Sequence, residues 1–379
     1  MGLVRERTIF VDANPLADRH LTGIGRYTAR LALALARHAP IRFFSQAEEV
    51  VPRGRLDWSQ DQDLAPWGRR VWRGKRKPLE TPPSNALAVY CCLRPEERVF
   101  AVEASVLHDF TPLIVPRTHA EKTVGMFQGL FGKTLLSSDF ALAVSHSTKA
   151  DAEWLTDFDP ARIVVAPSGP SLCVERHASN RAVERRANVG LVVSTLEPRK
   201  NAFFLLDWFR DSKELPEGAE LWWVGPLGWL TSKRELKKYQ NIGGNRRVRF
   251  LGVVSDARLC ELYRTAGWSI YPSLYEGFGF PVLDALRHGA PVLSAFHSAL
   301  REFRTPGVFF FDPCDAETVD QAWNQFGSAR ADLKIPLDEL DAAYNWDRVA
   351  RTLLDAGDRI VLTPGSSETG DEKTPGIAA

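Results

Sequence analysis

Short apolar runs alternate with longer amphipathic segments along most of this chain, and the alternation limits the folds open to it. Strand-like runs that are each followed by a helix-like segment are typical of β-α-β units with parallel sheets. In the first half we expect strands at residues 8–13, 41–45, 86–91, 101–109, 140–145 and 162–168. In the second half we expect strands at 189–195, 220–225, 247–252, 268–273, 291–295 and 307–312. The pattern predicts an α/β protein with two doubly wound domains.

The chain has 379 residues, which is enough for two domains that each bury a core of their own. A polar stretch without strand periodicity separates the two halves, and a helical segment and a polar tail follow the second half. The predicted order is a first domain at 1–173 with a basic insert at 51–85, a linker at 174–188, a second domain at 189–344, a helix at 345–362 and a disordered tail at 363–379.

Charge and cysteine usage argue against several classes of protein. A formal net charge of +1 disfavours a nucleic-acid-binding protein. The five cysteines include no C-x-x-C pair, so they predict buried thiols rather than zinc ligands or disulfides. No window contains the roughly 18 continuous apolar residues that a membrane span requires. We therefore expect a cytoplasmic protein.

The insert contains one unusual segment, PWGRRVWRGKRKP at 66–78, with six Lys or Arg residues and no acidic residue. Cations together with Trp67 and Trp72 are the combination expected where a segment rests on an anionic membrane interface. A solvated surface loop has the same composition. Peripheral contact with the inner face of the cell membrane and a plain loop both stay open at this point.

A glycine pair opens the first long helical segment. The sequence TGIG follows the first predicted strand and leads into a helix, with Gly23 and Gly25 beside the free N–H groups of the helix start. Such a turn lets backbone approach an anion. Thr28 stands where the dinucleotide pattern G-x-G-x-x-G needs its third glycine, so that pattern is incomplete. An ordinary helix-start turn explains the segment equally well.

Two further segments place polar residues directly after predicted strands. His108 and Asp109 end one strand, at the edge of a parallel sheet where ligands bind, although a single histidine is often structural. Arg199 and Lys200 stand between another strand and an amphipathic helix. Two cations beside a helix N-terminus favour a phosphate or diphosphate ligand. The alternative for this pair is a solvated helix start.

The stretch YPSLYEGFGFPVLDAL, residues 271–286, combines these features. Glu276 follows a predicted strand, and Gly277 and Gly279 let backbone approach a ligand. Pro281 suits the first turn of a helix, and Asp284 lies one turn further on. The glycines and the helix start suit a phosphate group, while the carboxylates suit hydroxyl groups. A sugar nucleotide carries both.

From about residue 8 to 355 the chain resembles the retaining, GT-B-fold glycosyltransferases of family four. The shared motifs, in family order, are TGIGRYT, LHDFTPL, AVSHSTKADAEWL, RIVVAPSG, STLEPRKN, LWWVGPLGW, VRFLGVVSDARLCELYRTA and YPSLYEGFGFPVLDALRHGAPVLSA. The resemblance implies two Rossmann-like domains that face a central cleft, with the acceptor on the N-terminal side and the nucleotide sugar on the C-terminal side. It also implies that neither a cofactor nor an essential metal is needed.

The resemblance implies a role for each candidate residue. Gly23 and Gly25 lie by the donor diphosphate, and His108 with Asp109 faces the reacting sugar. Arg199 and Lys200 neutralise the leaving diphosphate, and Glu276 binds hydroxyls of the donor sugar. The remaining donor-binding residues are Gly277, Phe278, Gly279, Phe280 and Asp284, of which the last grips the ribose.

Two positions depart from the family pattern. Asp284 replaces a glutamate, which shortens the ribose ligand by one methylene group. Ser194 stands where many members carry an arginine, which leaves the diphosphate charge to Arg199 and Lys200. The residues DQD at 61–63 match a metal motif of the other glycosyltransferase fold, but they lie in the insert and not at a strand end.

Motifs of this branch occur in mannosyl- and rhamnosyltransferases of bacterial polysaccharide assembly, which often use GDP-sugars. We therefore expect transfer of mannose or rhamnose to a saccharide acceptor, lipid-linked, in O-antigen, capsule or exopolysaccharide synthesis. The alternatives are a sugar-nucleotide epimerase of the same fold and a non-catalytic sugar-nucleotide-binding subunit. A nicotinamide-dependent dehydrogenase is disfavoured by the incomplete glycine pattern.

Overall fold

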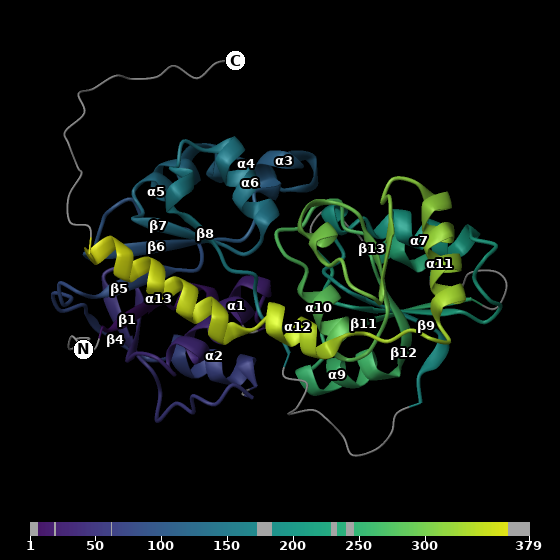
Figure 1. Cartoon of the computed structure of the whole chain (residues 1–379), viewed down its shortest axis with the longest axis horizontal. Coiled ribbons are helices and arrows are strands. Elements are labelled where there is room, and N and C mark those ends of the chain that lie inside the picture. The colour runs from purple at the N-terminus through teal and green to yellow at the C-terminus, as the bar shows by residue number, and fades with distance from the viewer. Residues whose placement is uncertain are drawn as a thin grey trace.

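The predicted strands form two separate sheets, one in each half of the chain, which lie side by side in Figure 1. This computed structural model describes residues 7–18, 20–61, 63–172, 184–228, 233–239 and 246–362. Every strand expected from the sequence is present within a few residues of its predicted bounds. The molecule therefore has the predicted pair of α/β domains.

The N-terminal sheet has the strand order β4-β3-β2-β1-β5-β6-β7-β8. Its strands are β1 (Ile9–Asp12), β2 (Ile41–Ser45), β3 (Glu48–Val51), β4 (Lys75–Pro78), β5 (Leu87–Tyr90), β6 (Val102–Leu107), β7 (Phe140–Ala143) and β8 (Ile163–Val165). Strands β2, β1, β5, β6, β7 and β8 pair in parallel, and β3 and β4 extend the sheet as an antiparallel edge. Central strands such as β1 are fully buried because helices cover both faces of the sheet.

The helices of this half are α1 (Gly23–Leu35), α2 (Leu64–Trp72), α3 (Thr111–Ile114), α4 (Glu121–Met126), α5 (Gly132–Leu136) and α6 (His146–Leu155). Short helical turns are η1 (Asn14–Leu16), η2 (Pro116–Thr118), η3 (Phe127–Phe131) and η4 (Pro160–Arg162). Two of the long helices have capped starts, because Thr22 accepts a hydrogen bond from Gly25 N and Ser145 accepts one from Thr148 N.

The C-terminal sheet is parallel throughout, in the order β11-β10-β9-β12-β13-β14. Its strands are β9 (Arg186–Val193), β10 (Glu220–Val224), β11 (Arg247–Gly252), β12 (Ala266–Tyr271), β13 (Val292–Ala295) and β14 (Val308–Phe311). Its helical elements are η5 (Pro198–Lys200), α7 (Ala202–Asp211), α8 (Lys233–Lys237), α9 (Asp256–Thr265), α10 (Phe280–Arg287), η6 (Ser298–Glu302), α11 (Ala316–Ala329) and α12 (Leu337–Ala343). The order of strands reverses at β9, which is the usual place for a ligand in such a sheet.

The insert at 51–85 is more ordered than its composition suggested. Helix α2 and edge strand β4 occupy much of it, so the alternative of a plain loop at 66–78 is wrong. Leu64, Trp67 and Val71 recur at helical spacing and are buried. Helix α2 packs against α1 and η1 of the N-terminal domain. Pro66 does not interrupt the helix because it lies in its first turn, where a missing N–H costs nothing.

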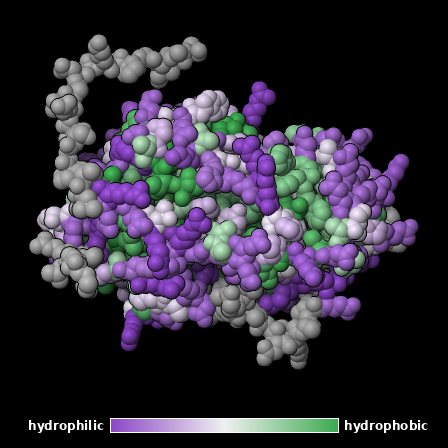
Figure 2. Space-filling view, in the orientation of Figure 1, coloured by the Kyte–Doolittle hydropathy of each residue, from purple (hydrophilic) through white to green (hydrophobic). Residues whose placement is uncertain are grey.

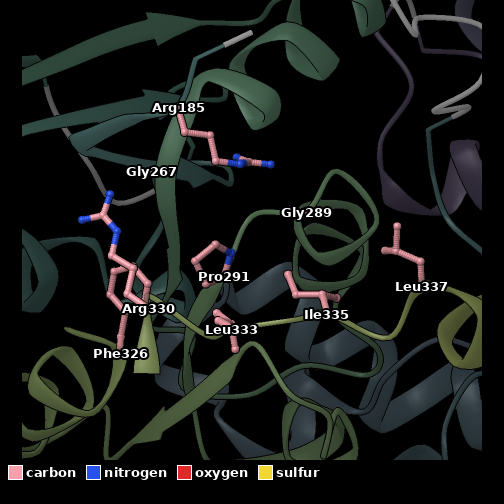
Figure 3. Close-up of a pocket in the computed structure, with 9 residues that line it drawn as sticks. All are labelled: Arg185, Gly267, Gly289, Pro291, Phe326, Arg330, Leu333, Ile335 and Leu337. Atoms are coloured by element: carbon pink, nitrogen blue, oxygen red, sulfur yellow. The ribbon is translucent and has the colours of Figure 1, made fainter. Parts of the chain in front are cut away.

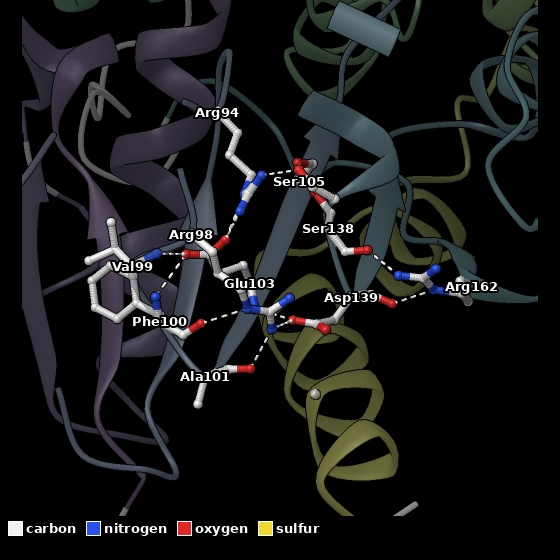
Figure 4. Close-up of polar contacts among 12 residues, drawn as sticks. Arg94, Arg98, Val99, Phe100, Ala101, Glu103, Ser105, Ser138, Asp139 and Arg162 are labelled. Atoms are coloured by element: carbon white, nitrogen blue, oxygen red, sulfur yellow. Dashed lines mark hydrogen bonds and ion pairs between the residues drawn. The ribbon is translucent and has the colours of Figure 1, made fainter. Parts of the chain in front are cut away.

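A buried ion pair lies at the amino-terminal end of strand β6 in the N-terminal sheet (Figure 4). The guanidinium of Arg94 bonds to the carboxylate of Glu103, with Nε 2.6 Å from Oε2. The other carboxylate oxygen accepts hydrogen bonds from the backbone N–H groups of Val99 and Phe100, at 2.8 and 2.9 Å. Because Glu103 lies near the start of β6 and His108 follows its end, this network is structural and remote from the candidate site.

Helix α13 (Trp346–Leu362) returns to the N-terminal domain and runs along it, as the yellow helix in Figure 1 shows. Trp346 Nε1 donates to the carbonyl of Pro170 at 2.8 Å, and Arg7 pairs with Asp358 at 2.9 Å. The predicted linker at 174–188 overlaps strand β9, which begins at Arg186, and residues 173–183 lie outside the described residues. The predicted disordered tail at 363–379 lies outside them as well.

The helices and the surface of the described part of the chain both bear on whether it crosses a membrane. None of the described helices has both the length and the apolar composition that such a span requires. The face shown in Figure 2 is mainly hydrophilic, with smaller apolar areas over both domains.

Candidate active site

A cavity of about 510 Å³ lies between the two domains, at the carboxyl ends of both sheets. Eleven of the twelve predicted site residues line it, and Gly25 is the exception. The N-terminal domain contributes Thr22, Gly23, Ile24, Arg26, His108, Asp109, Val144, Ser168 and Ser171. The C-terminal domain contributes Val193, Ser194, Thr195, Glu197, Arg199, Lys200, Leu259, Tyr271, Glu276, Gly277, Phe278, Gly279, Phe280, Pro281 and Asp284. The structure thus brings together residues that are up to 262 positions apart, from Thr22 to Asp284.

The two glycines at the start of α1 have different surroundings. A side chain at Gly23 would meet no atom within 4 Å, so its backbone is open to the cavity. A Cβ atom at Gly25 would lie 2.7 Å from the carbonyl oxygen of Pro15, so Gly25 is required for packing. Gly23 can therefore offer its backbone to an anion, while Gly25 lets the helix start approach η1 closely.

His108 is half-buried and is uncharged at neutral pH. Its Nε2 lies 3.0 Å from the carbonyl oxygen of Cys91, and the ring edge packs against Tyr27. Burial lowers the pKa of His108 to about 4, despite the opposing effects of the Cys91 carbonyl and Asp109. Because a carbonyl only accepts, Nε2 carries the ring hydrogen and Nδ1 remains an acceptor at neutral pH. The neighbouring Asp109 holds its own loop, since Oδ1 accepts from Thr111 N and Oγ1.

The two cations of the second domain share one carboxylate. Lys200 Nζ lies 2.5 Å from Glu276 Oε1, and Arg199 Nη1 lies 2.9 Å from Glu276 Oε2. The second Nη atom of Arg199 contacts Glu197 Oε1 at 3.1 Å. Within the described residues, the buried Nε of Arg199 has no hydrogen-bond partner. The cluster is compact and charged, and it lines the cavity that a donor would fill.

The charges in this cluster depend on one another. Burial alone would raise the pKa of Glu276, but Arg199 and Lys200 lower it to about 2. Glu276 is therefore ionised at any physiological pH. Burial raises the pKa of Glu197, against the opposing effect of Arg199 and Lys200. An anion in the cavity would lie beside cations that already pair with these carboxylates.

The loop between β12 and α10 needs glycine for two different reasons. A Cβ atom at Gly277 would lie 1.6 Å from the carbonyl oxygen of His108, so the two domains meet there backbone to backbone. Gly279 has a φ of +123°, which L-residues rarely adopt, and it caps the start of α10. Room for a ligand was the predicted reason for both glycines; at Gly277 the structure shows a domain contact.

Asp284 lines the cavity, but its carboxylate is engaged with the N-terminal domain. One oxygen accepts from the backbone N–H groups of Ser171 and Leu172 at 3.0 and 3.3 Å, and the other accepts from Ser171 Oγ. Burial raises the pKa of Asp284, although these hydrogen bonds oppose the shift. The arrangement indicates an interdomain tether, and the ribose contact stays a prediction.

The sequence reasoning did not identify several residues that line the cavity. Tyr271 bonds to both Lys200 and Glu276, and its place at the end of a predicted strand was the available signal. Arg26 forms an ion pair with Asp256 of the second domain at 2.5 Å, which no local pattern indicates. The discounted Asp61 and Asp63 lie before α2 and away from the cavity lining, and Gln62 lies outside the described residues.

Another cavity, of about 400 Å³, lies in the C-terminal domain and includes none of the predicted site residues (Figure 3). Apolar side chains of its walls include Phe326, Leu333 and Ile335, and two arginines, Arg185 and Arg330, line it as well. The guanidinium of Arg185 donates to the carbonyls of Tyr263 and Ala266, at 2.9 and 2.8 Å, so it supports the backbone. The interdomain cavity is the one that brings the predicted site residues together.

Comparison with known proteins identifies the kind of enzyme. Residues 175–333 match the family described as "Glycosyl transferases group 1". Arg199, Lys200 and Glu276 of the cavity lie in that stretch. This chain is a glycosyltransferase. The matched stretch lies mainly in the C-terminal domain.

One curated relative of this glycosyltransferase is the O-antigen chain mannosyltransferase B of Escherichia coli, 24% identical over 355 residues. The match covers 82% of this chain and 90% of the relative. Sucrose-phosphate synthase from Thermosynechococcus elongatus has the same fold, with a TM-score of 0.68 at 16% identity over 94% of this chain and 99% of that one. Anabaena HepE in complex with UDP and glucose gives a TM-score of 0.61 at 16% identity over 93% and 100% of the two chains. The predicted GT-B fold is confirmed.

Proposed function

We propose that this glycosyltransferase moves mannose from a nucleoside-diphosphate sugar, GDP-mannose, to a saccharide acceptor in bacterial surface polysaccharide synthesis. The observation that carries the proposal is the Arg199, Lys200 and Glu276 cluster in the interdomain cavity. The choice of mannose and of O-antigen chains rests on the similarity to the Escherichia coli mannosyltransferase. We propose a retaining reaction and membership of family four on the motif resemblance, with rhamnose as the second candidate sugar.

The chemistry follows from the charges that line the cavity. The bond from the sugar's anomeric carbon to the phosphate oxygen breaks, a bond to the acceptor hydroxyl oxygen forms, and the hydroxyl proton is released. Negative charge develops on the departing diphosphate, so its stabilisation is the main catalytic task. Lys200 and Arg199 supply positive charge, and the open backbone at Gly23 supplies an N–H donor. Glu276, ionised and beside both cations, accepts hydrogen bonds from sugar hydroxyls.

The two domains have different roles in the proposed reaction. The C-terminal domain binds the donor through Lys200, Glu276 and the start of α10. The N-terminal domain faces the acceptor, with neutral His108 as a hydrogen-bonding group at the reacting sugar. The acceptor we propose is lipid-linked, which places the reaction at the cytoplasmic face of a membrane.

A donor screen tests the proposed function. Saturation-transfer NMR of the purified protein with GDP-mannose, GDP-rhamnose, dTDP-rhamnose and UDP-glucose is expected to show transfer to GDP-mannose above the others. Release of GDP is then measured with a saccharide acceptor and excess EDTA, and turnover is expected to persist because two cations and a helix start replace a metal. Binding of none of these donors would contradict the proposed function. Loss of turnover that Mg²⁺ restores would contradict the metal-free reaction.

Peripheral membrane contact is a separate proposal, which rests on the exposed cations of the insert at 51–85 rather than on its tryptophans. Trp67 is buried, and the guanidinium of Arg76 lies 4.3 Å from the ring of Trp72, so the tryptophans are not free anchors. Lys77 pairs with Glu49 at 3.0 Å. The cations that remain exposed on this edge are Arg53, Arg55, Arg70, Arg73 and Lys75. We propose that these five, the basic edge, contact anionic lipid by charge alone, at about 1 kcal/mol each.

Co-sedimentation with liposomes that contain anionic lipid tests the basic edge. A variant with Arg70, Arg73 and Lys75 changed to Ser is expected to bind less, and salt is expected to release the wild type because it screens surface charge. The matched control changes Lys213, Arg234 and Lys237, three exposed cations of the other domain, to Ser. Equal binding by both variants, or none by the wild type, would remove the membrane role.

A further inference from the structure

Tyr271 lies at the carboxyl end of β12, where the strand meets the cavity. Its side chain is buried, with 4% exposed. The hydroxyl accepts a hydrogen bond from Lys200 Nζ at 3.0 Å and donates one to Glu276 Oε1 at 3.1 Å. The ring centroid is 5.3 Å from the same Nζ atom, within the range of a cation–π contact. One side chain thus contacts both members of the Lys200–Glu276 pair.

The contact with Tyr271 helps to set the orientation of the Lys200 ammonium group. A lysine ammonium has three N–H donors and no acceptor. Within the described residues, Lys200 donates to two oxygens, Tyr271 Oη and Glu276 Oε1. Both acceptors are buried, and the ammonium itself lines the cavity. Two fixed acceptors set the orientation of the group, which leaves its third donor for a ligand in the cavity.

We propose that Tyr271 is a positioning residue for glycosyl transfer, whose hydroxyl orients the ammonium of Lys200 so that one N–H points at the leaving diphosphate. The inference rests on the proposed function, because it needs Lys200 to bind that group. It assigns to Tyr271 no direct contact with the donor. Its effect passes through Lys200, and the same hydroxyl also donates to Glu276.

The charged groups around Lys200 predict a signature that a purely structural tyrosine would not give. Burial and Arg199 lower the pKa of Lys200, whereas Glu276, Tyr271 and Glu197 raise it, and the net shift is upward. Removal of the Tyr271 hydroxyl takes away one acceptor that favours the charged ammonium. The pKa of Lys200 in the variant is therefore expected to fall, and activity that needs the ammonium is lost at a lower pH.

The variant Tyr271→Phe removes the hydroxyl and keeps the ring, so the packing of the ring is preserved. Its matched control is Tyr263→Phe, which removes another buried hydroxyl of the same domain, one that donates to the Pro281 carbonyl at 3.4 Å and that is not among the described hydrogen-bond partners of Lys200. The first readout needs no donor: the pKa of Lys200 is measured by NMR titration of its labelled ammonium-bearing carbon in the free protein. The second is kcat and KM as functions of pH, with whichever nucleotide sugar the wild type turns over.

For Tyr271→Phe we expect kcat to fall about tenfold, the size of effect expected of one hydrogen bond to a charged group, with donor KM changed less. The alkaline limb of the kcat profile and the Lys200 pKa are both expected to move to lower pH, while Tyr263→Phe matches the wild type. An unchanged Lys200 pKa and pH profile, or equal changes in the control, would overturn the inference alone. No turnover of any nucleotide sugar by the wild type would contradict the proposed function, and the catalytic role of Tyr271 with it.

Discussion

At the scale of single residues, the cavity keeps its two cations paired with the carboxylate of Glu276. Buried charges without partners are costly, so the pairing allows Arg199 and Lys200 to stay in the cavity before a ligand arrives. The sequence predicted these three residues from their places after strands. It did not predict that they contact one another, because the contact joins loops after two different strands of the sheet.

Asp284 carries a prediction at this scale. Its side chain is buried and both oxygens bond to Ser171 or Leu172. The glutamate of the family pattern is one methylene longer and would crowd this site. We expect Asp284→Glu to lower the free energy of unfolding by about 1 to 3 kcal/mol, the usual cost of overpacking. Denaturant unfolding measures the change.

The matched control for Asp284 is Asp211→Glu, at an exposed position of the same domain. That substitution is expected to leave the stability within about 0.5 kcal/mol of the wild type. If Asp284→Glu were as stable as the control and bound the nucleotide sugar more tightly, the tether interpretation would be wrong, and the ribose contact would gain support.

At the scale of elements, the loop from β12 to α10 and the turn η6 join the two domains. Thr148 Oγ1 donates to the carbonyl of Gly277 at 3.1 Å, and Tyr275 donates to Asp151 at 2.6 Å. Glu302 of η6 accepts from the backbone N–H groups of His146 and Ser147, so it caps helix α6 of the other domain. The loop that carries Glu276 is therefore held from both domains.

Gly277 is the tightest point of this loop and gives a prediction. A methyl group there would lie 1.6 Å from the His108 carbonyl oxygen, so Gly277→Ala must displace the domains or the loop. We expect kcat/KM to fall about 100-fold, since displacements of about 1 Å in a catalytic site have effects of that size. The control is Gly327→Ala in α11, where an added methyl group meets no atom within 4 Å. Wild-type kinetics for Gly277→Ala would show that the domain contact does not matter for turnover.

The buried strands could be predicted from the sequence, whereas the antiparallel edge strands and helix α2 could not. Strands such as β1, β7 and β12 are mostly apolar and are buried along their whole length, so their composition located them. Strands β3 and β4 were not predicted, because an exposed edge strand such as Lys75–Pro78 has no apolar pattern. Helix α2 was missed because its buried residues are spaced among arginines and a proline.

At the scale of the whole molecule, the site exists only because two domains meet. The sheets present their carboxyl ends to one cavity, and α13 leaves the second domain to pack on the first. The resemblance to known motifs predicted this arrangement. The particular contacts, such as Arg26 with Asp256 and Asp284 with Ser171, could not be predicted, because they depend on how two separately folded surfaces fit.

The central claim is that the interdomain cavity binds a nucleotide sugar and that Lys200 stabilises its leaving diphosphate. The most direct measurement is kcat/KM for GDP-mannose in the wild type, in Lys200→Ala and in Lys213→Ala, an exposed lysine of the same domain. We predict a loss of about 100-fold or more for Lys200→Ala, as for other single electrostatic donors, and no change for Lys213→Ala. Turnover by Lys200→Ala close to that of the wild type would contradict the account.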